Sequence, residues 1–509
     1  MATEKRLILR SALPAALVFA AAWAFHRSYA GFGIAPFDEG ILIDGAWRIL
    51  RGEHFGREFL APYGPLPYHV LALWFAIFEP SVATFRELAV VLQSVGAVLL
   101  FLAAWRLARL EGALLAAGCL ILAHGSWHKS FLQLAVALQV YAASCCLDSL
   151  RIRTAAGLGL AAAVAFLCRY DVGGFAMLAS GVAIIFRRDA SARRRIESLA
   201  SLCSAFLLVV GGVYAILAVR GLDLVEWWFL TWQRILAQEW IDAPFPRPWT
   251  RGFGWGSFST GALFVALATA ALCYLGSILG VALRALWRRR DGADPARLCI
   301  ALLGLCLTNQ TRLIPSSNHF FQGALPLYLL ASDLLSRNGR PWWIRLWMPV
   351  FTALLFLWVL RGTSGLYPAS FTARIEDAIR LELPTGRAGV RIAAADAAVL
   401  ETLVKAVLEV TADGESIATS PRCPLVAFLC DRPLAQPFAE PSYYYRNARY
   451  QQRVIEALDR TRPRIWVHDP RAAATFVFPE AAPLLFEYFT RHYRAARAIG
   501  PYSLFMRAD

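Results

Sequence analysis

The sequence is poor in charged side chains. Only 17% of its 509 residues are Asp, Glu, Lys or Arg, whereas 58% are hydrophobic, and the mean hydropathy is +0.48. Soluble globular proteins carry about 25% charged residues. The shortage of charge therefore excludes an ordinary soluble domain and predicts a polytopic α-helical membrane protein.

Motifs for nucleotide or catalytic zinc binding are also missing. The sequence contains no P-loop, no H-E-x-x-H pair and no dinucleotide fingerprint, which argues against nucleotide-driven or zinc-dependent chemistry. The formal net charge of +15 is compatible with nucleic-acid binding, but the arginines form short clusters between apolar segments rather than one basic stripe. We therefore expect no nucleic-acid partner and interpret the clusters as topology signals.

The apolar segments are long enough, or nearly so, to cross the hydrocarbon of a bilayer, and they predict about eleven transmembrane helices. They are centred on 7–25, 87–105, 112–123, 131–150, 154–168, 172–186, 198–219, 258–283, 298–308, 319–335 and 346–360. The basic clusters fall in every second loop, which predicts an N-terminus inside and a C-terminus outside. The first segment lacks a convincing cleavage site, so we expect a retained helix rather than a signal peptide.

This topology divides the chain into a transmembrane domain, 1–361, whose first outer loop is 26–86, and an extracytoplasmic domain, 362–509. In the loop, apolar residues from Ile41 to Leu50 share one helical face and Asp44, Arg48 and Arg51 the other, as in a helix lying along the membrane surface. The segment 66–78 is apolar but too short to span, so it predicts a second interfacial or re-entrant helix.

The tail alternates strand and helix patterns and predicts a small α/β domain. Its "GESIATS", "PLVAFL", "RVIEALDRTRPRIWVHD" and "LLFEYFTRHYRAARAIGPYSLFMR" segments indicate a strand, a short helix, a helix and strand, and a second helix and strand. Cys423 and Cys430 lie in this tail, and an oxidising location makes a disulfide between them as plausible as two free thiols.

Two adjacent carboxylates, Asp38 and Glu39, stand at the start of the first amphipathic helix. A carboxylate near hydrocarbon and beside a second carboxylate can have its pKa raised, which would suit Asp38 to accept a proton from a hydroxyl group. The other interpretation is a helix cap, since carboxylates accept hydrogen bonds from the free N–H groups of a first turn. Both interpretations stay open on chemistry alone.

The run from Phe37 to Leu88 resembles the first outer loop of bacterial type C membrane glycosyltransferases, the protein O-mannosyltransferase and aminoarabinose-transferase-like group. The similarity lies in the "DE" pair after the first helix, the "GREF" step at 56–59, the "YGP" at 63–65 and Arg86 at the start of the second membrane helix. The many-helix core with a small outer α/β tail is similar too, so the resemblance covers most of the chain in architecture and about 90 residues in motifs.

The resemblance implies an inverting glycosyltransferase of a bacterial inner membrane that moves a hexosyl or pentosyl group from a polyprenyl-phosphate donor. The acceptor would be a glycan, a lipid or a protein on the periplasmic or extracellular side. Asp38 would be the general base, and Glu39 would orient the acceptor or help to hold a metal ion. Tyr63 and Arg86, which carry part of the similarity, would contact the substrate.

A lipid-phosphate leaving group requires positive charge, which selects the cations at the outer helix ends. Arg pairs bidentately with phosphate, so Arg169 and Arg312 are the first candidates, with snorkelling to the interface as the alternative. Asp171 is expected to pair with Arg169. The remaining candidates are Lys129, beside His128, and His319.

Several enzymes of this type have a second acidic residue in the loop after the third helix, but 124–129 contains none. We therefore predict no tightly held metal, with room for a loosely bound divalent cation. A multi-pass transporter and a non-catalytic envelope-glycan assembly protein are the alternatives to an enzyme. A transporter would bind its substrate near the midplane, whereas here the polar groups lie in the outer loops.

Overall fold

The computed structural model forms two compact units, each assembled from separated stretches of the chain. The helix bundle comprises Met1–Tyr29, Ala89–Gly212 and Ile241–Phe371, and the loop-and-sheet unit comprises Ala30–Leu88, Val213–Trp240 and Thr372–Asp509. The residues that the structure describes are 2–108, 110–122, 126–146, 150–187, 189–229, 255–286, 294–313, 317–336, 377–420, 423–439, 447–470 and 482–508.

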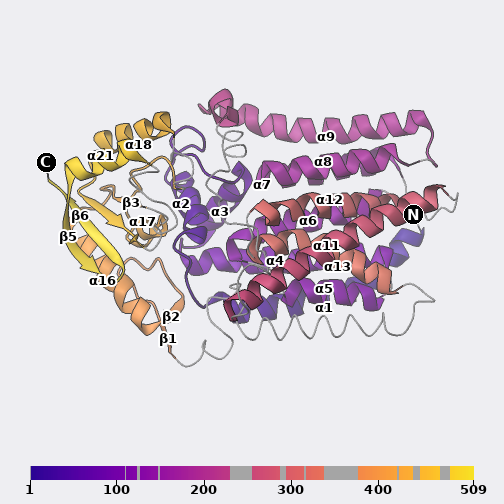
Figure 1. Ribbon diagram of the computed structural model, residues 1–509, viewed down its shortest axis with the longest axis horizontal. Helices are drawn as coiled ribbons and strands as arrows, with labels where there is room; N and C mark the ends of the chain where they lie inside the picture. The colour runs from indigo at the N-terminus through magenta and orange to yellow at the C-terminus, as the bar shows by residue number, and fades with distance from the viewer. Residues whose placement is uncertain are drawn as a thin grey trace. The chain divides into compact units, whose positions relative to one another are not determined.

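Long apolar helices make up the helix bundle (Figure 1). They are α1 (Ala2–Ala30), α4 (Val82–Leu107), α5 (Leu110–Leu122), α6 (Ser130–Cys146), α7 (Ile152–Cys168), α8 (Tyr170–Ile185), α9 (Ala192–Val219), α11 (Trp255–Leu286), α12 (Asp294–Leu313) and α13 (Ser317–Ser336), with the short 3-10 helix η1 (Trp127–Lys129) before α6. Each helix from α1 to α13 covers one of the predicted segments. The eleventh predicted segment, 346–360, lies outside the described residues.

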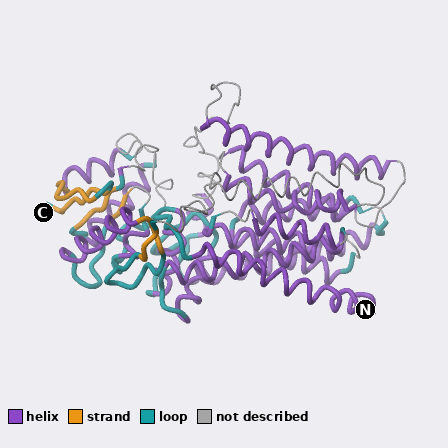
Figure 2. Tube along the Cα trace, turned by 90° about the horizontal axis from the view of Figure 1, so that it is seen from below, coloured by secondary structure: helices purple, strands orange, loops and turns teal. Residues whose placement is uncertain are grey.

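Neighbouring helices of the bundle run side by side, as the two views in Figures 1 and 2 show. α12 packs on α8, α11 and α13, and α7 packs on α6 and α8. Polar side chains inside the bundle find partners on other helices, because an unpaired polar group is costly in an apolar interior. Tyr274 donates to the carbonyl of Gly323 at 2.6 Å, and Gln139 donates to Ser180 at 2.9 Å.

Several helices expose apolar side chains over much of their length. Leu207 and Leu208 on α9 are 64% and 76% exposed, and Leu272 on α11 is 71% exposed. In the described part of the chain, α4 and α9 are long and apolar enough to cross a membrane, and shorter apolar helices lie within α5, α7, α8, α11 and α13 and at Pro65–Ile77. An apolar surface of this extent is what a helix bundle presents to lipid rather than to water.

The loop-and-sheet unit contains shorter elements. Two helices, α2 (Asp38–Leu50) and α3 (Pro65–Ile77), come from the first loop. The C-terminal chain supplies β1 (Ala378–Arg380), β2 (Arg391–Ala393), α16 (Ala394–Val410), β3 (Ala418–Ser420), α17 (Leu425–Leu429), α18 (Ala448–Thr461), β4 (Ile465–His468), α21 (Pro483–His492), β5 (Tyr493–Ile499) and β6 (Tyr502–Arg507).

A mixed four-stranded sheet organises the C-terminal chain. Its strand order is β3-β4-β6-β5, in which β3 and β4 are parallel and the other neighbours antiparallel, while β1 and β2 form a separate antiparallel pair. Trp466 on β4 is fully buried and packs edge-on against Phe489 of α21 and Tyr493 of β5. β3, α17, α18, β4 and α21 coincide with the strand and helix patterns of the tail, whereas the last segment forms two strands, β5 and β6, where the sequence predicts one, and β1, β2 and α16 are not among the predicted elements.

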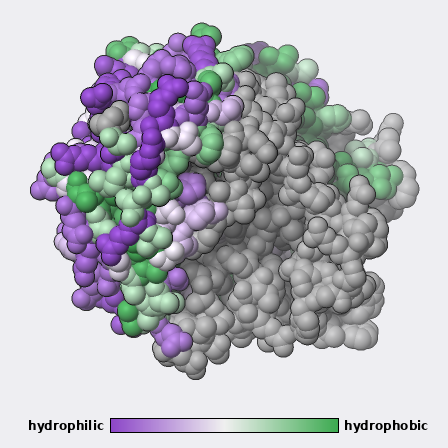
Figure 3. Space-filling view, turned by 60° about the vertical axis from the view of Figure 1, so that its left-hand side comes forward, coloured by the Kyte–Doolittle hydropathy of each residue, from purple (hydrophilic) through white to green (hydrophobic). Residues whose placement is uncertain are grey.

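The coloured face of the molecule in Figure 3, where the C-terminal elements come forward, is largely hydrophilic with scattered apolar residues. This differs from the exposed apolar side chains of α9 and α11. The predicted domain boundary between 361 and 362 lies outside the described residues. What the structure shows is that the first loop and the C-terminal chain belong to the same compact unit.

The disulfide considered between Cys423 and Cys430 is absent, because both residues are free thiols. The helix α17 separates them, so that Cys423 precedes its first turn and Cys430 follows its last. Both side chains are fully buried, and burial raises the pKa of each thiol. They therefore behave as small apolar core residues.

Candidate active site

The two carboxylates of the acidic pair lie in different environments. Glu39 is 1% exposed and forms a bidentate ion pair with Arg86 of α4, in which Nε donates to Oε1 and Nη2 to Oε2, both at 2.9 Å. Glu39 Oε2 also accepts from the backbone N–H of Ala35 at 3.0 Å. Both carboxylate oxygens are thus occupied, and the charge of Glu39 is neutralised inside the unit.

Asp38 is partly exposed, in contrast to the buried Glu39 that follows it. It is the first residue of α2, whose N-cap is Phe37, and the cap residue makes no side-chain hydrogen bond. The free N–H groups and the dipole of a helix N-terminus favour a negative charge in the first turn. Asp38 is therefore held as the accessible carboxylate of the pair at the start of a well-buried helix.

Arg86 binds backbone carbonyls as well as the carboxylate of Glu39. Its Nη1 donates to the carbonyls of Ala30 and Phe32, at 3.1 and 2.6 Å, in the segment that leads into α2. Arg86 is itself 1% exposed. Because its donors are committed to Glu39 and to these carbonyls, the geometry favours a positioning role for Arg86 over the predicted contact with substrate.

The chain before Asp38 is also held by the C-terminal residues. Gly33 donates to the carbonyl of Arg391 on β2, and Arg391 donates back to Gly31, both at 2.7 Å. Gly33 has a φ of +74°, a conformation that glycine adopts without strain. A parallel bridge between Phe32 and Arg391 completes the contact, so the loop runs beside β2 like a short additional strand.

α17 packs directly on the first turns of α2. Leu425 donates its N–H to the carbonyl of Pro36 at 3.3 Å, and a Cβ on Gly40 would lie 2.6 Å from Leu425 N and 2.9 Å from Leu425 Cβ. Phe428 packs edge-on against Trp47 at 5.6 Å between ring centroids. The "DEG" triplet therefore needs its glycine because another helix fills the space where a side chain would stand.

The polar face of α2 is buried, which differs from the predicted helix on the membrane surface. Arg48 pairs with Asp44 and with Glu53, both at 3.1 Å, and its Nη2 donates to the carbonyls of Leu434 and Gln436 at 2.8 and 2.5 Å. The amphipathic pattern was recognised correctly, but its polar face binds the C-terminal chain rather than water. Burial raises the pKa of Asp44 to about 6, opposed by the neighbouring Arg48.

The "GREF" and "YGP" motifs lie between the end of α2 and the start of α3. Gly56 has a φ of +88°, and a Cβ there would lie 2.1 Å from Leu222 Cδ1, so the turn packs closely against the second predicted outer loop. Phe55 and Phe59 surround Tyr68 of α3 with centroid distances of 5.7 and 6.3 Å. Tyr63 lies half-buried just before α3 begins.

The other candidate residues belong to the helix bundle. Arg169 links α7 and α8 and pairs with Asp171 at 2.9 Å, which confirms the predicted pairing. Lys129, in η1, is buried. Arg312 lies near the end of α12 and His319 near the start of α13, and their side chains are outside the described part. The structure thus places Asp38, Glu39, Tyr63 and Arg86 in the same compact unit. That these residues share one active site with the cations of the helix bundle stays a prediction.

The expectation that the protein holds no tightly bound metal also stays a prediction. Within the described ranges, no group of three or more His, Cys, Asp and Glu side chains gathers in a way that could hold a metal ion. Glu39, which the resemblance offered as a metal ligand, has both oxygens engaged by Arg86 and Ala35.

Sequence reasoning missed the residues that support the acidic pair from far along the chain. Arg48 reaches Leu434 across 386 residues of sequence, and Leu425 and Arg391 also come from the C-terminal chain. The signal that could have found Arg48 is its place opposite the apolar stripe of a helix, since an arginine among buried residues needs acceptors.

Comparison with solved structures identifies the class of fold. The structure is similar to that of ArnT from Cupriavidus metallidurans bound to undecaprenyl phosphate, with a TM-score of 0.55, 13% sequence identity and coverage of 97% of both chains. ArnT in the apo state gives a TM-score of 0.52 with 13% identity, covering 99% of this chain and 98% of that one. No protein-family model matches the sequence, and no curated protein matches it.

A third similar structure is the Archaeoglobus fulgidus oligosaccharyltransferase in the apo form, with a TM-score of 0.52 and 11% identity, covering 93% of this chain and 72% of that one. ArnT and this oligosaccharyltransferase are members of the type C glycosyltransferase superfamily. The predicted resemblance is therefore confirmed at the level of the fold, which extends over nearly the whole chain.

Proposed function

We propose that this chain is an inverting glycosyltransferase that moves a sugar from a polyprenyl-phosphate donor to an extracytoplasmic acceptor, with Asp38 as the general base. The fold supports this, since ArnT, whose fold it shares over 97% of the chain, has been solved with undecaprenyl phosphate bound. The charge pattern of the loops supports an active site on the periplasmic or extracellular side of a bacterial inner membrane.

We choose Asp38 rather than Glu39 as the base because the two carboxylates lie in different environments. A general base must come within hydrogen-bond reach of the hydroxyl that it deprotonates. Glu39 is buried and bound on both oxygens, whereas Asp38 is partly exposed at the same helix start. Asp38 is therefore the carboxylate of the pair that an acceptor could approach.

The surroundings of Asp38 hold it in place before any substrate binds. Arg86, β2 and α17 fix the segment from Ala30 to Gly40 through side-chain and backbone hydrogen bonds. A base that is already positioned needs less ordering in the transition state, which lowers the barrier to attack on the anomeric carbon.

The departing lipid phosphate would be stabilised by cations of the helix bundle. Lys129, Arg169, Arg312 and His319 are the proposed contributors, and Arg169 would act with its charge shared with Asp171. No tightly bound metal is part of this proposal, which leaves room for a loosely bound divalent cation. The energy for transfer comes from the activated donor phosphate.

The test is the variant Asp38→Asn, which keeps the shape of the side chain and removes its basicity. We expect transfer to fall by about 10²- to 10⁴-fold, with an unchanged thermal unfolding midpoint. Lipid extracts of cells that lack the protein first show which polyprenyl-linked sugar accumulates. Release of polyprenyl phosphate from that donor by the purified protein then measures the rate.

Asp396→Asn is the matched control, because Asp396 is an exposed aspartate in the first turn of α16 in the same unit. It should transfer sugar at the wild-type rate. A folded Asp38→Asn protein with the same rate as this control would remove Asp38 as the base.

A further inference from the structure

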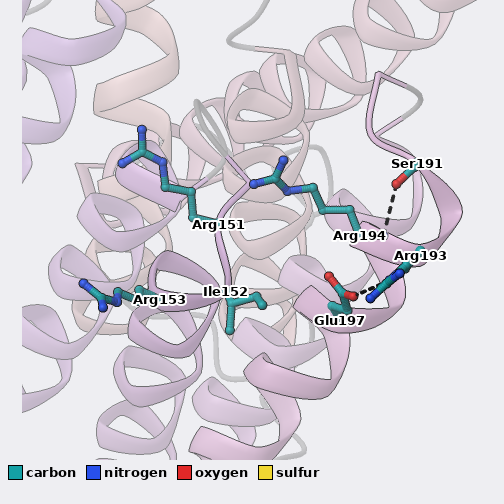
Figure 4. A pocket seen from close by; sticks show the side chains of 7 residues that line it. All are labelled: Arg151, Ile152, Arg153, Ser191, Arg193, Arg194 and Glu197. Carbon is teal, nitrogen blue, oxygen red and sulfur yellow. Dashed lines mark hydrogen bonds and ion pairs between the residues drawn. The ribbon is translucent and has the colours of Figure 1, made fainter. Parts of the chain in front are cut away.

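A cavity of about 650 Å³ opens where α7 and α9 begin, within the helix bundle (Figure 4). Most of its lining is basic. Arginine side chains come from both helices, together with a serine hydroxyl, one glutamate and one isoleucine, and the lining residues are Arg151, Ile152, Arg153, Ser191, Arg193, Arg194 and Glu197. A cavity with this lining is suited to a negatively charged ligand.

One of the four arginines is partly neutralised. Arg193 pairs with Glu197 one turn further along α9, at 2.8 Å between Nε and Oε1, as the dashed line in Figure 4 shows. The four arginines and one glutamate leave three positive charges in excess. Figure 4 shows the guanidinium end of Arg194 extending toward the α7 side of the cavity, where Arg151 stands.

Two helix N-termini add to this positive field. α7 begins at Ile152 and α9 at Ala192, so the first turns of both helices lie at the cavity, where the backbone N–H of Arg194 donates to the hydroxyl of Ser191 at 3.3 Å. The partial positive charge at a helix N-terminus and the forked donors of arginine both match the oxygens of a phosphate group.

The cavity is far from Arg169, a candidate phosphate-binding residue of the helix bundle. α7 has 17 residues and ends next to Arg169, so the cavity lies about 25 Å from that residue along the helix axis. The charge pattern of the sequence also assigns Arg151, Arg153 and the basic run at 187–195 to the cytoplasmic side. The cavity and Arg169 therefore lie at opposite ends of α7.

An apolar surface begins directly beside the arginines. Ile152, in the lining, is 53% exposed, and Ile196, one turn into α9, is 66% exposed. α7 and α9 pack tightly here, since a Cβ on Gly159 would lie 2.3 Å from the carbonyl oxygen of Leu202 and Ser201 donates to the carbonyl of Ile152 at 2.9 Å. α9 is long and strongly apolar, and only 17% of its most apolar 18-residue stretch is buried.

We propose that this cavity binds the phosphate headgroup of an anionic phospholipid, with the acyl chains against the exposed apolar side chains of α7 and α9. Arg151 and Arg194 hold the phosphate oxygens, and Arg153 supplies further positive charge. A soluble phosphate would use only the arginines. The adjoining exposed isoleucines and the weakly buried α9 favour a ligand that carries hydrocarbon as well.

Native mass spectrometry of the purified protein with phosphatidylglycerol tests the proposal. The wild-type protein should retain phosphatidylglycerol in preference to phosphatidylcholine. The double variant Arg151→Gln/Arg194→Gln should bind phosphatidylglycerol at least roughly tenfold more weakly, since each basic residue near an anionic lipid surface contributes about a factor of five. The single variant Arg194→Gln should show part of this loss and covers the case in which the double variant fails to fold.

Arg220→Gln is the control, because it removes one exposed arginine that follows the other end of α9. It should bind phosphatidylglycerol as the wild type does. An equal affinity of the wild type and the Arg194→Gln variant would overturn the proposal. Displacement of the lipid by glycerol phosphate at equal concentration would overturn it as well, because the ligand would then be a soluble phosphate.

Discussion

The helix bundle and the loop-and-sheet unit use their ion-paired arginines in different ways. In the bundle, arginines pair with carboxylates on neighbouring helices: Arg297 of α12 with Asp333 of α13 at 2.8 Å, and Arg284 of α11 with Asp294 of α12 at 2.5 Å. In the loop-and-sheet unit, Arg48 and Arg86 pair with carboxylates and also donate to backbone carbonyls.

The difference follows from the backbone that surrounds each charge. Most helical carbonyls accept hydrogen bonds within their own helix, so an arginine between helices relies on side-chain acceptors or on the carbonyls of a last turn, as Arg106 does with the carbonyl of Ser144 near the end of α6 at 3.3 Å. Irregular segments leave carbonyls without partners, and a buried carbonyl needs a donor. Arginines in the loop-and-sheet unit therefore stabilise irregular chain around Asp38, and those in the bundle join regular elements.

Among the variants that test this difference between the two units, Arg86→Ala is expected to have the largest effect. Removal of one partner leaves the Glu39 charge buried and uncompensated, and two carbonyls lose their donor, at a cost of roughly 3–5 kcal/mol. We expect a lower thermal unfolding midpoint and loss of transfer activity together, because the segment that positions Asp38 is released.

Arg297→Ala is the matching variant in the bundle, where it removes the buried ion pair with Asp333. It should lower the midpoint similarly, while the protein that stays folded transfers sugar at close to the wild-type rate. Full activity of Arg86→Ala at permissive temperature would mean that Arg86 does not position the loop.

A smaller effect is expected from Gly40→Ala. The added methyl group meets Leu425 of α17, and overpacking of this kind costs about 1–3 kcal/mol. Gly174→Ala in α8 is the control from the bundle, because nothing lies within 4 Å of the added Cβ, and alanine in an open helix position stabilises by up to about 1 kcal/mol. Thermal unfolding midpoints of the two variants should move in opposite directions, and a drop for both would contradict the contact with α17.

The smallest effect concerns the pH dependence of stability. Burial raises the pKa of Asp44 in the folded state to about 6, above its value of 3.8 when unfolded. The folded state therefore holds this proton more tightly, so the contribution is fully present below pH 4 and is lost as the pH rises through 6.

Asp44→Asn should remove this component, so that the difference in midpoint between variant and wild type changes between pH 4 and pH 6 and is constant above pH 7. Asp396→Asn, at an exposed site, should show no such change. A difference that does not vary with pH would show that Asp44 titrates near its ordinary pKa.

Sequence alone predicted the elements well, because hydropathy and periodicity are local properties. The predicted apolar segments within the described residues matched the helices of the bundle, and the alternation in the tail matched β3, α17, α18, β4 and α21, but it predicted one strand where β5 and β6 form an antiparallel pair. The acidic pair and its place at a helix start were also found. The resemblance added the class of fold, which comparison of structures confirms.

What sequence could not provide are the partners of the polar residues. Glu39 and Arg86 are 47 positions apart, and nothing local in either segment specifies their ion pair. α2 looked like a surface helix because Asp44 and Arg48 are polar, although their partners lie in the C-terminal chain and so bury that face. An amphipathic pattern shows that a helix has one apolar and one polar face. Only the tertiary contacts decide whether water or another part of the chain covers the polar face.

The pairing of the segment 31–33 with Arg391 has a consequence for biosynthesis. The loop that carries Asp38 leaves the ribosome early, but its strand partner and α17 are made roughly 350 residues later, which takes roughly 20 to 70 s at ordinary rates of translation. Until then the N–H of Gly33, the carbonyl of Pro36 and the guanidinium of Arg48 lack the partners that the C-terminal chain gives them. Asp38, the proposed base, therefore reaches its final surroundings only when translation is almost complete, however many of the helices have already formed.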